Sequence, residues 1–111
     1  MSNEEELEEQ IFEIISNVGS AKSCFIESIQ EAKKGNIEKA RALIKEGDIS
    51  FVAGHKVHHS LLQKEMEGEP VKISLIVLHA EDQIMAADSF KTIAAAFIDL
   101  YEELQSVKNA K

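Results

Sequence analysis

Apolar residues recur at steps of three and four along most of this chain, a spacing that predicts amphipathic helices. The pattern is interrupted at Gly35-Asn36 and again at Gly68-Glu69-Pro70, where glycine and proline indicate turns. Short connections make consecutive helices antiparallel. The pattern therefore predicts an all-α chain, a single domain over residues 1–111 built as an antiparallel three-helix bundle. The predicted helices span about residues 3–34, 36–66 and 71–107.

The third predicted helix is apolar on two sides. A helix turns ~100° per residue, so each position can be placed around the axis relative to His79. The first stripe, about 60–140° away, holds Ile76, Ala80, Ile84, Ala87, Ala94 and Ile98. The second stripe, about 240–320° away, holds Leu75, Leu78, Asp82, Met85, Ile93, Ala96 and Leu100. The opposite edge is polar and holds Glu81, Asp88, Thr92 and Asp99. Because a helix apolar around most of its circumference is buried on most sides, and so short a chain cannot cover it, we expect an oligomer.

Two residues interrupt this apolar surface within one turn, His79 and Asp82. Asp82 lies inside the second stripe and has no Lys or Arg three or four positions away. A carboxylate among apolar side chains is costly unless a metal ion, a proton or a partner compensates it. If cyclic symmetry places the third helix on the axis, copies of Asp82 converge there. A hard divalent cation such as Mg²⁺ would neutralise them.

The second predicted helix contributes three of the four histidines, at His55, His58 and His59. His58 lies about as far before the second turn as His79 lies after it, so antiparallel helices bring the two to a similar height. His55 lies one turn away from His58 and is expected in the same region. The i, i+4 pair His55 and His59 has no third ligand nearby in sequence, so it does not predict a metal site.

Charge and composition argue against several classes of function. The formal net charge of −8 argues against binding nucleic acid, which needs clustered Lys and Arg, and suits docking to a basic protein surface. No apolar run approaches the ~20 residues that span a bilayer, and the N-terminus is acidic rather than signal-like, so we expect a cytoplasmic protein without membrane insertion. The single Cys24 cannot form an internal disulfide, and no cysteine–histidine spacing predicts zinc.

The stretch Leu78-His79-Ala80-Glu81-Asp82-Gln83-Ile84-Met85 resembles the active-site signature of a known family. This family is the lactose/cellobiose-type IIA component of the bacterial phosphoenolpyruvate-dependent sugar phosphotransferase system, whose pattern reads approximately H-A/G-Q/E-D-H/Q-L/I-M. Ile73 to Val77 and Glu38-Lys39-Ala40 also fit the family. The resemblance covers nearly the whole chain.

The resemblance implies a homotrimer of three-helix bundles, nine helices in all, that acts as a phosphotransferase. His79 would accept the phosphoryl group, at its tele nitrogen, from the phosphohistidine form of the carrier protein HPr, and would pass it to a cysteine of the IIB component. Asp82 would meet its two copies around Mg²⁺ or another divalent cation on the three-fold axis. Gln83, His55 and His58 are expected as supporting residues, although Gln83 stands where many members carry His and His58 where many carry Gln. The pathway would import a β-linked disaccharide such as cellobiose, lactose or chitobiose.

Two other classes fit the helical pattern. A histidine phosphotransfer domain of a two-component relay also carries its histidine on a helical bundle, but there a Lys-Gly pair typically follows the histidine, and here Ala80 and Glu81 do. A non-catalytic helical assembly module would explain the amphipathic helices, yet it leaves His79 and Asp82 without a purpose.

Overall fold

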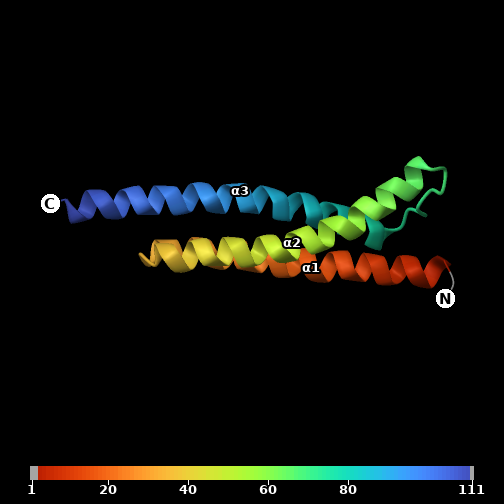
Figure 1. The fold of residues 1–111 in the computed structure, drawn as a ribbon, viewed down its shortest axis with the longest axis horizontal. Coiled ribbons are helices and arrows are strands. Elements are labelled where there is room, and N and C mark those ends of the chain that lie inside the picture. Colours follow the sequence, from red (N-terminus) through yellow and green to blue (C-terminus); the bar gives the residue numbers. More distant parts are fainter. Residues whose placement is uncertain (1–2, 111) are drawn as a thin grey trace.

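The computed structural model describes residues 3–110 and consists of three long helices, α1 (Asn3–Lys33), α2 (Ile37–Met66) and α3 (Leu75–Asn109), without a strand in that range. Consecutive helices run antiparallel in an elongated bundle measuring 64 × 21 × 20 Å (Figure 1). α2 crosses the start of α3 near one end, and at the other end α3 extends past the α1–α2 turn. The predicted all-α, three-helix architecture is confirmed. Residues 1–2 and 111 of the predicted domain lie outside the described range.

Glycines at two positive-φ positions end α1 and α2 in the same way. At the end of α1, Gly35 has φ +92° and its N–H donates to the Ala32 carbonyl at 3.0 Å, while the Asn36 N–H donates to the Glu31 carbonyl at 2.9 Å. This pair of bonds is the Schellman arrangement, which needs a left-handed residue that glycine adopts without steric cost. Gly68, with φ +96°, ends α2 through an equivalent pair of bonds.

The Asn36 side chain does not cap α2, contrary to the expectation for an N-cap asparagine. Its Nδ2 instead donates to Glu31 Oε1 at 3.0 Å, across the turn. Glu31 is buried and also lies 3.3 Å from Lys34 Nζ and 3.5 Å from Lys39 Nζ. The amide thus stabilises a buried carboxylate, which needs such partners more than an exposed helix start does.

The third helix begins at Leu75, so the predicted start at residue 71 is wrong by four residues. Pro70 precedes an irregular stretch, and Ser74, in extended conformation, accepts a hydrogen bond from the Val77 N–H at 3.4 Å. Apolar residues at 71 and 73 continue the helical spacing and concealed this boundary. The serine N-cap, which the apolar spacing obscured, sets the true start.

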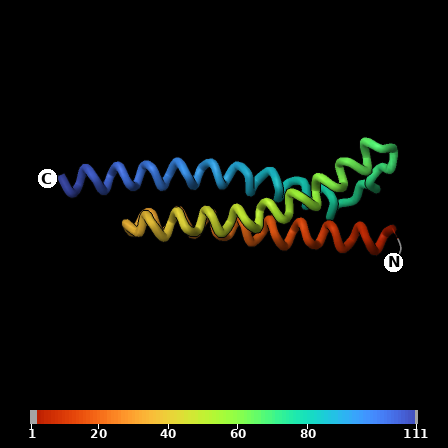
Figure 2. The backbone as a smooth tube through the Cα atoms, viewed as in Figure 1, coloured from red at the N-terminus to blue at the C-terminus, as the bar shows by residue number. Residues whose placement is uncertain are grey.

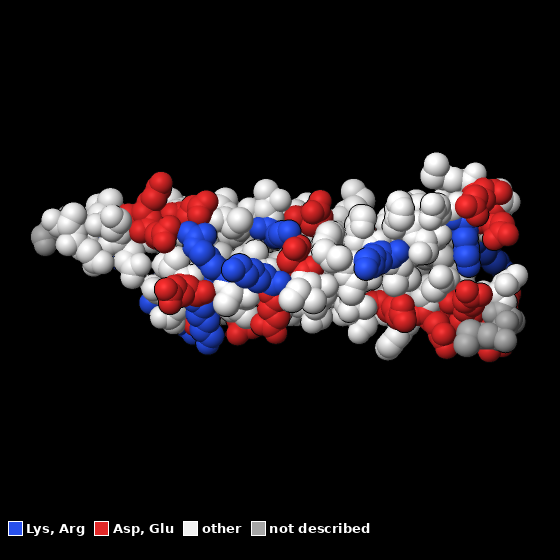
Figure 3. Space-filling view, viewed as in Figure 1, with Lys and Arg blue, Asp and Glu red and all other residues white. Residues whose placement is uncertain are grey.

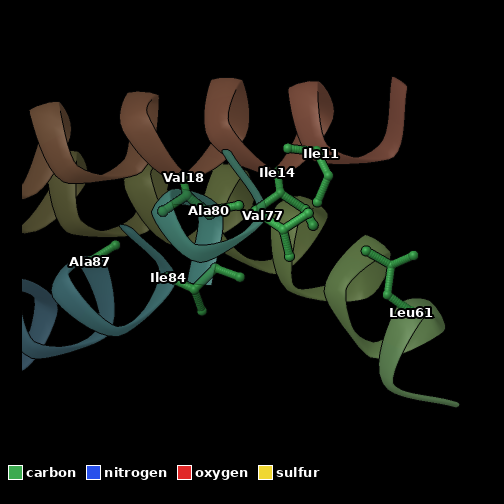
Figure 4. Packing of buried hydrophobic residues seen from close by; sticks show 8 residues of the cluster. All are labelled: Ile11, Ile14, Val18, Leu61, Val77, Ala80, Ile84 and Ala87. Carbon is green, nitrogen blue, oxygen red and sulfur yellow. The ribbon is translucent and has the colours of Figure 1, made fainter. Parts of the chain in front are cut away.

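The core lies along α1. In the cluster nearest the start of α1, side chains from all three helices point toward one another (Figure 4). Further along, Phe25 is fully buried against α3, together with Ala21 and Ala94. The first predicted stripe of α3 faces this core, except that Ile76 at its start is exposed. The cluster drawn in Figure 4 comprises Ile11, Ile14, Val18, Leu61, Val77, Ala80, Ile84 and Ala87.

Helices α2 and α3 contact each other least of the three pairs, and ion pairs join them at several points. Acidic and basic side chains alternate where α2 lies against α3 (Figure 3). Arg41 Nη2 lies 3.3 Å from Asp99 Oδ1 and 2.9 Å from Glu102 Oε1, and Lys91 Nζ lies 2.5 Å from Asp48 Oδ1. The polar edge predicted for α3 therefore faces α2 rather than solvent alone.

Two glycines let α2 approach α1 closely. A Cβ atom on Gly47 would lie 2.7 Å from Phe25 Cε1, and one on Gly54 would lie 2.8 Å from Val18 Cγ2. Both distances are below van der Waals contact, and Phe25 and Val18 are fully buried and cannot swing away. These contacts explain why glycine occupies both of these buried positions of α2, a helix that runs unbroken through them.

We expect Gly54→Ala to lower the free energy of unfolding by about 1–3 kcal/mol, because the added methyl group overpacks a rigid β-branched neighbour. Gly19→Ala is the matched control, since a Cβ there meets nothing within 4 Å. It should raise stability by about 0.5–1 kcal/mol, as alanine does within a helix. Urea unfolding at one fixed protein concentration compares the two, and equal effects would contradict the close approach of α1 and α2.

Stability should fall in acid partly through Glu31. The hydrogen bond from Asn36 lowers the pKa of Glu31 below its usual 4.5, outweighing the opposing effect of burial, and Lys34 and Lys39 act in the same direction. A carboxyl whose pKa is lower in the folded state stabilises the fold above its unfolded pKa, and this contribution is lost as the pH falls through the folded value. Glu31→Gln, which cannot titrate, should therefore show a smaller decline in thermal midpoint on acidification than the parent chain. Identical declines would mean that Glu31 contributes nothing to acid sensitivity.

Candidate functional site

His79 lies in the second turn of α3, near the end of the bundle where α1 begins and α2 ends. Its side chain is exposed, and within residues 3–110 no hydrogen bond or ion pair reaches the ring. Val77, two residues before it, and Ala80, directly after it, are buried against α1 and hold this turn to the bundle. The imidazole therefore stands on a fixed backbone with both nitrogens available for chemistry.

Asp82 lies one turn after His79 and is also exposed. The second predicted stripe that surrounds it is exposed along its whole length, with Leu75 at 84%, Leu78 at 51% and Met85 at 69%. Ile93 and Leu100 continue this surface. A continuous apolar strip on a single helix is typical of a surface that another protein covers. We call this strip, Leu75 to Leu100 on the Asp82 side of α3, the α3 seam.

His58 meets α3 two residues beyond His79, at Glu81. The His58 Nε2 atom contacts Glu81 Oε1, and the His58 ring is mostly buried. The His55 ring is 6.2 Å from that of His58 and 5.9 Å from that of Phe51, and it is more exposed than His58. The two helices thus meet at the predicted height, but the partner of His58 is Glu81. The sequence pattern predicts Glu81 on the polar edge of the third helix and indicates no functional role for it. The available signal for its location was its position about 200° around the helix from His79.

Gln83 is half-buried one turn after His79, and within residues 3–110 its side chain makes no hydrogen bond. Cys24 lies on α1 toward the middle of the bundle, away from this turn. Burial raises the pKa of the Cys24 thiol, and the nearby Glu46 and Glu27 add to the increase. Because the thiolate is the reactive form, a cysteine of this kind is a poor nucleophile at neutral pH.

A single copy of the chain does not assemble a metal site: residues 3–110 contain no group of three or more His, Cys, Asp or Glu side chains arranged to hold an ion. Nor does this part of the chain contain a helix that is long and apolar enough to cross a bilayer. The His79 turn therefore combines an exposed histidine, an exposed carboxylate one turn away and the apolar α3 seam.

A known family combines these features. The family model described as "PTS system, Lactose/Cellobiose specific IIA subunit" matches residues 9–102, which include the whole His79 turn. The chain belongs to this family. It is therefore a phosphotransferase component of a sugar phosphotransferase system, as the resemblance predicted, and the match decides against a two-component phosphotransfer domain.

Characterised relatives agree with this assignment over nearly full length. The chain is 38% identical over 96 residues to the oligo-β-mannoside-specific EIIA component of Bacillus subtilis, covering 86% of this chain and 87% of the relative. It is 35% identical over 106 residues to the lichenan-specific IIA component of the same organism, covering 96% of each. It is also 33% identical over 100 residues to the lactose-specific EIIA component of Staphylococcus aureus, covering 90% of this chain and 97% of the relative.

Solved structures agree as well. The cellobiose-specific enzyme IIA of Bacillus anthracis superimposes with a TM-score of 0.88 at 34% identity, covering 96% of this chain and 94% of that one. PtcA of Streptococcus mutans superimposes with a TM-score of 0.86 at 30% identity, covering 92% of this chain and 99% of that one. The three-helix architecture of the IIA component is thus shared with crystal structures of relatives.

Proposed function

We propose that His79 is the residue that carries the phosphoryl group, receiving it from phosphorylated HPr and passing it to a cysteine of the IIB component. The observation that supports this role best is the placement of His79, an exposed imidazole without a partner among the described residues, on a buried and well-packed turn of α3. A relay between two proteins needs an acceptor that each partner reaches in turn. His79 meets that requirement, whereas Cys24 and His58 are less accessible.

In the first step, the Nε2 (tele) lone pair of neutral His79 attacks phosphorus on the donor phosphohistidine. The new N–P bond forms as the donor's N–P bond breaks, and the donor leaves as neutral imidazole. In the second step, a thiolate of the IIB component attacks phosphorus and the His79 N–P bond breaks. Because such transfer is loose and in-line, the protein contributes mainly by positioning the groups and stabilising charge. The transfers take place in the cytoplasm.

The charge around the site suits a basic donor. Six glutamates and no Lys or Arg occupy residues 4–13, and red side chains gather over this start of α1 in Figure 3. The start of α1 packs beside the His79 turn, through Ile11 and Ile14 against Val77 and Ala80. Opposite charges on two docking surfaces accelerate encounter and fix orientation more than they raise affinity. Such an acidic surface favours a partner whose contact face carries Lys and Arg.

The α3 seam supports a homotrimer in which three copies of α3 meet at the axis. One chain leaves the large apolar side chains of the seam in water, although α3 is packed on its other side. Burying such side chains contributes about 1.5–3 kcal/mol each, so assembly along the seam gains far more than isolated surface residues would. Three bundles then form a nine-helix assembly with a closed, symmetric interface.

Asp82 suits a shared metal site in that trimer. Each chain contributes one exposed carboxylate from the middle of an apolar seam, and three such carboxylates offer the oxygen ligands that Mg²⁺ or another hard divalent cation prefers. Without a cation, three converging carboxylates repel one another. The ion would neutralise this charge and stabilise assembly, and it takes no part in the transfer to and from His79.

Gln83 and His55 complete the proposed site as supporting residues. Gln83 lies one turn from His79 with amide groups that can bind a phosphoryl oxygen or orient the ring. His55 is exposed beside the mostly buried His58, on the helix that crosses the start of α3.

The sugar class follows from the relatives, whose names specify oligo-β-mannoside, lichenan, lactose and cellobiose. We infer a β-linked disaccharide or related β-glycoside as the transported sugar.

His79→Gln should abolish phosphorylation while leaving the helical content unchanged, because the exposed ring makes no contact within residues 3–110 that the fold needs. The measurement is intact-protein mass after incubation with phosphoenolpyruvate, enzyme I and HPr, with peptide mapping of the modified residue. His59→Gln is the matched control, an exposed histidine on α2 that should still accept one phosphoryl group per chain. Stoichiometric phosphorylation of the His79→Gln variant would refute the assignment.

Chelation should weaken the trimer of the parent chain, because unneutralised Asp82 carboxylates repel. Asp82→Asn removes the charge, so its trimer should be insensitive to chelator. Light scattering coupled to size exclusion, with and without EDTA, reports the mass of each.

Ile93→Glu, on the α3 seam, should give monomers, whereas Ile49→Glu on the exposed side of α2 should not. A parent chain that is monomeric under all conditions would contradict both the trimer and the shared ion.

A further inference from the structure

His58 and Glu81 form a polar contact between α2 and α3 that the transfer chemistry described above does not use. α2 crosses the start of α3 (Figure 2), and the Nε2 atom of His58 on α2 contacts Oε1 of Glu81 on α3. A carboxylate oxygen can only accept, so Nε2 is the donor, and a neutral ring then carries no proton on Nδ1. Nδ1 is fully buried and has no partner within the described residues. The hydrogen bond to Glu81 is thus the polar contact that fixes the orientation of the His58 ring.

The contact adds a polar restraint from α2 beside the apolar packing that holds the His79 turn. Val77, Ala80 and Ile84 hold this turn against α1. Residues 71–74, just before α3, are irregular and offer no helical continuation that would resist rotation of the helix. Glu81 points about 200° away from His79 around the axis. Anchoring Glu81 to α2 therefore fixes the side of the helix opposite His79 and leaves the His79 ring free to face a partner.

A small rotation of α3 about its axis would displace the His79 ring relative to the phosphorus atom that it attacks. The side-chain surface of a helix lies roughly 5–6 Å from its axis, so a turn of about 10° moves a side-chain atom by about 1 Å. Displacements of about 1 Å in the reacting groups can cost on the order of a hundredfold in rate. The polar contacts between α2 and α3 are few, and the others lie further along the bundle, at Asp48–Lys91 and at Arg41 with Asp99 and Glu102.

We propose that His58 is a positioning residue for phosphoryl transfer: through its hydrogen bond to Glu81 it sets the rotation of the α3 turn that presents His79. This inference rests on the proposed function. His58 does not touch the phosphoryl group in this role, and the hydrogen bond, rather than the imidazole as such, is the required feature.

The first test measures phosphorylation by HPr in steady state. His58→Leu should lower kcat by roughly tenfold or more and leave the KM for phosphorylated HPr within about twofold, because the docking surface is unchanged. His58→Gln should restore most of kcat, since its terminal amide nitrogen can take the place of Nε2 as donor. Glu81→Ala, at a half-exposed position, breaks the same contact and replaces His58→Leu should that variant fail to fold.

Asp48→Leu is the matched control. It breaks another polar contact between α2 and α3, Asp48–Lys91 at 2.5 Å, whose α3 partner lies twelve residues after His79, or ~18 Å along the helix. It should lower the thermal midpoint but leave kcat unchanged. A merely structural role for His58 would make the two variants alike, so a His58→Leu enzyme with normal kcat, or a His58→Gln enzyme as slow as His58→Leu, overturns the proposal.

The second test needs no phosphoryl donor. Amide hydrogen exchange over Leu78 to Asp82 should accelerate in His58→Leu and remain at the parent rate in Asp48→Leu. Unchanged exchange in both variants overturns the restraint itself. If the parent chain takes up no phosphate from HPr, the proposed function fails, and with it the claim of positioning for transfer, whereas the exchange result still decides whether His58 holds the turn.

Discussion

The structure depends on an imbalance in α3, which is apolar on two sides while α1 and α2 together cover only one. The covered side, from Val77 to Ile98, packs on α1 and determines which way the helix faces. The uncovered side is then turned outward as a continuous apolar seam with Asp82 in its middle. His79 lies on the boundary between these two sides. The packing that stabilises one chain therefore also decides which residues are left for other proteins.

The three helix pairs are joined by different kinds of interaction. α1 binds α2 through close backbone approach at Gly47 and Gly54, and it binds α3 through aliphatic packing. α2 and α3 share the apolar core clusters and are joined in addition by charged and polar side chains. Polar contacts at a partly exposed surface contribute little to stability compared with apolar burial. Hydrogen bonds and ion pairs do require a particular geometry, so in this fold these contacts orient α3 more than they stabilise its packing.

Much of this fold can be predicted from the sequence because helical periodicity and turn chemistry are local. Gly35 and Gly68 indicated both helix ends, and each occupies a left-handed conformation there. The start of α3 could not be placed correctly, because apolar spacing at 71 and 73 imitates a helix and only the Ser74 hydrogen bond decides. Asn36 stands at the N-cap position of α2, yet its side chain bonds to Glu31 instead, because the cost of a buried carboxylate depends on tertiary burial that local sequence does not show.

The candidate site divides along the same line. His79 and Asp82 are visible in the sequence because both interrupt an apolar pattern within one turn. The contact between His58 and Glu81 is not, because it depends on the angle at which α2 crosses α3, a quantity that no local pattern encodes. Such a division suits a relay, in which the acceptor must be reachable by two different proteins. Each partner protein in turn can supply the groups that surround the reacting ring, because the ring has no partner among the described residues of its own chain. This requires that the helix that carries the ring does not move.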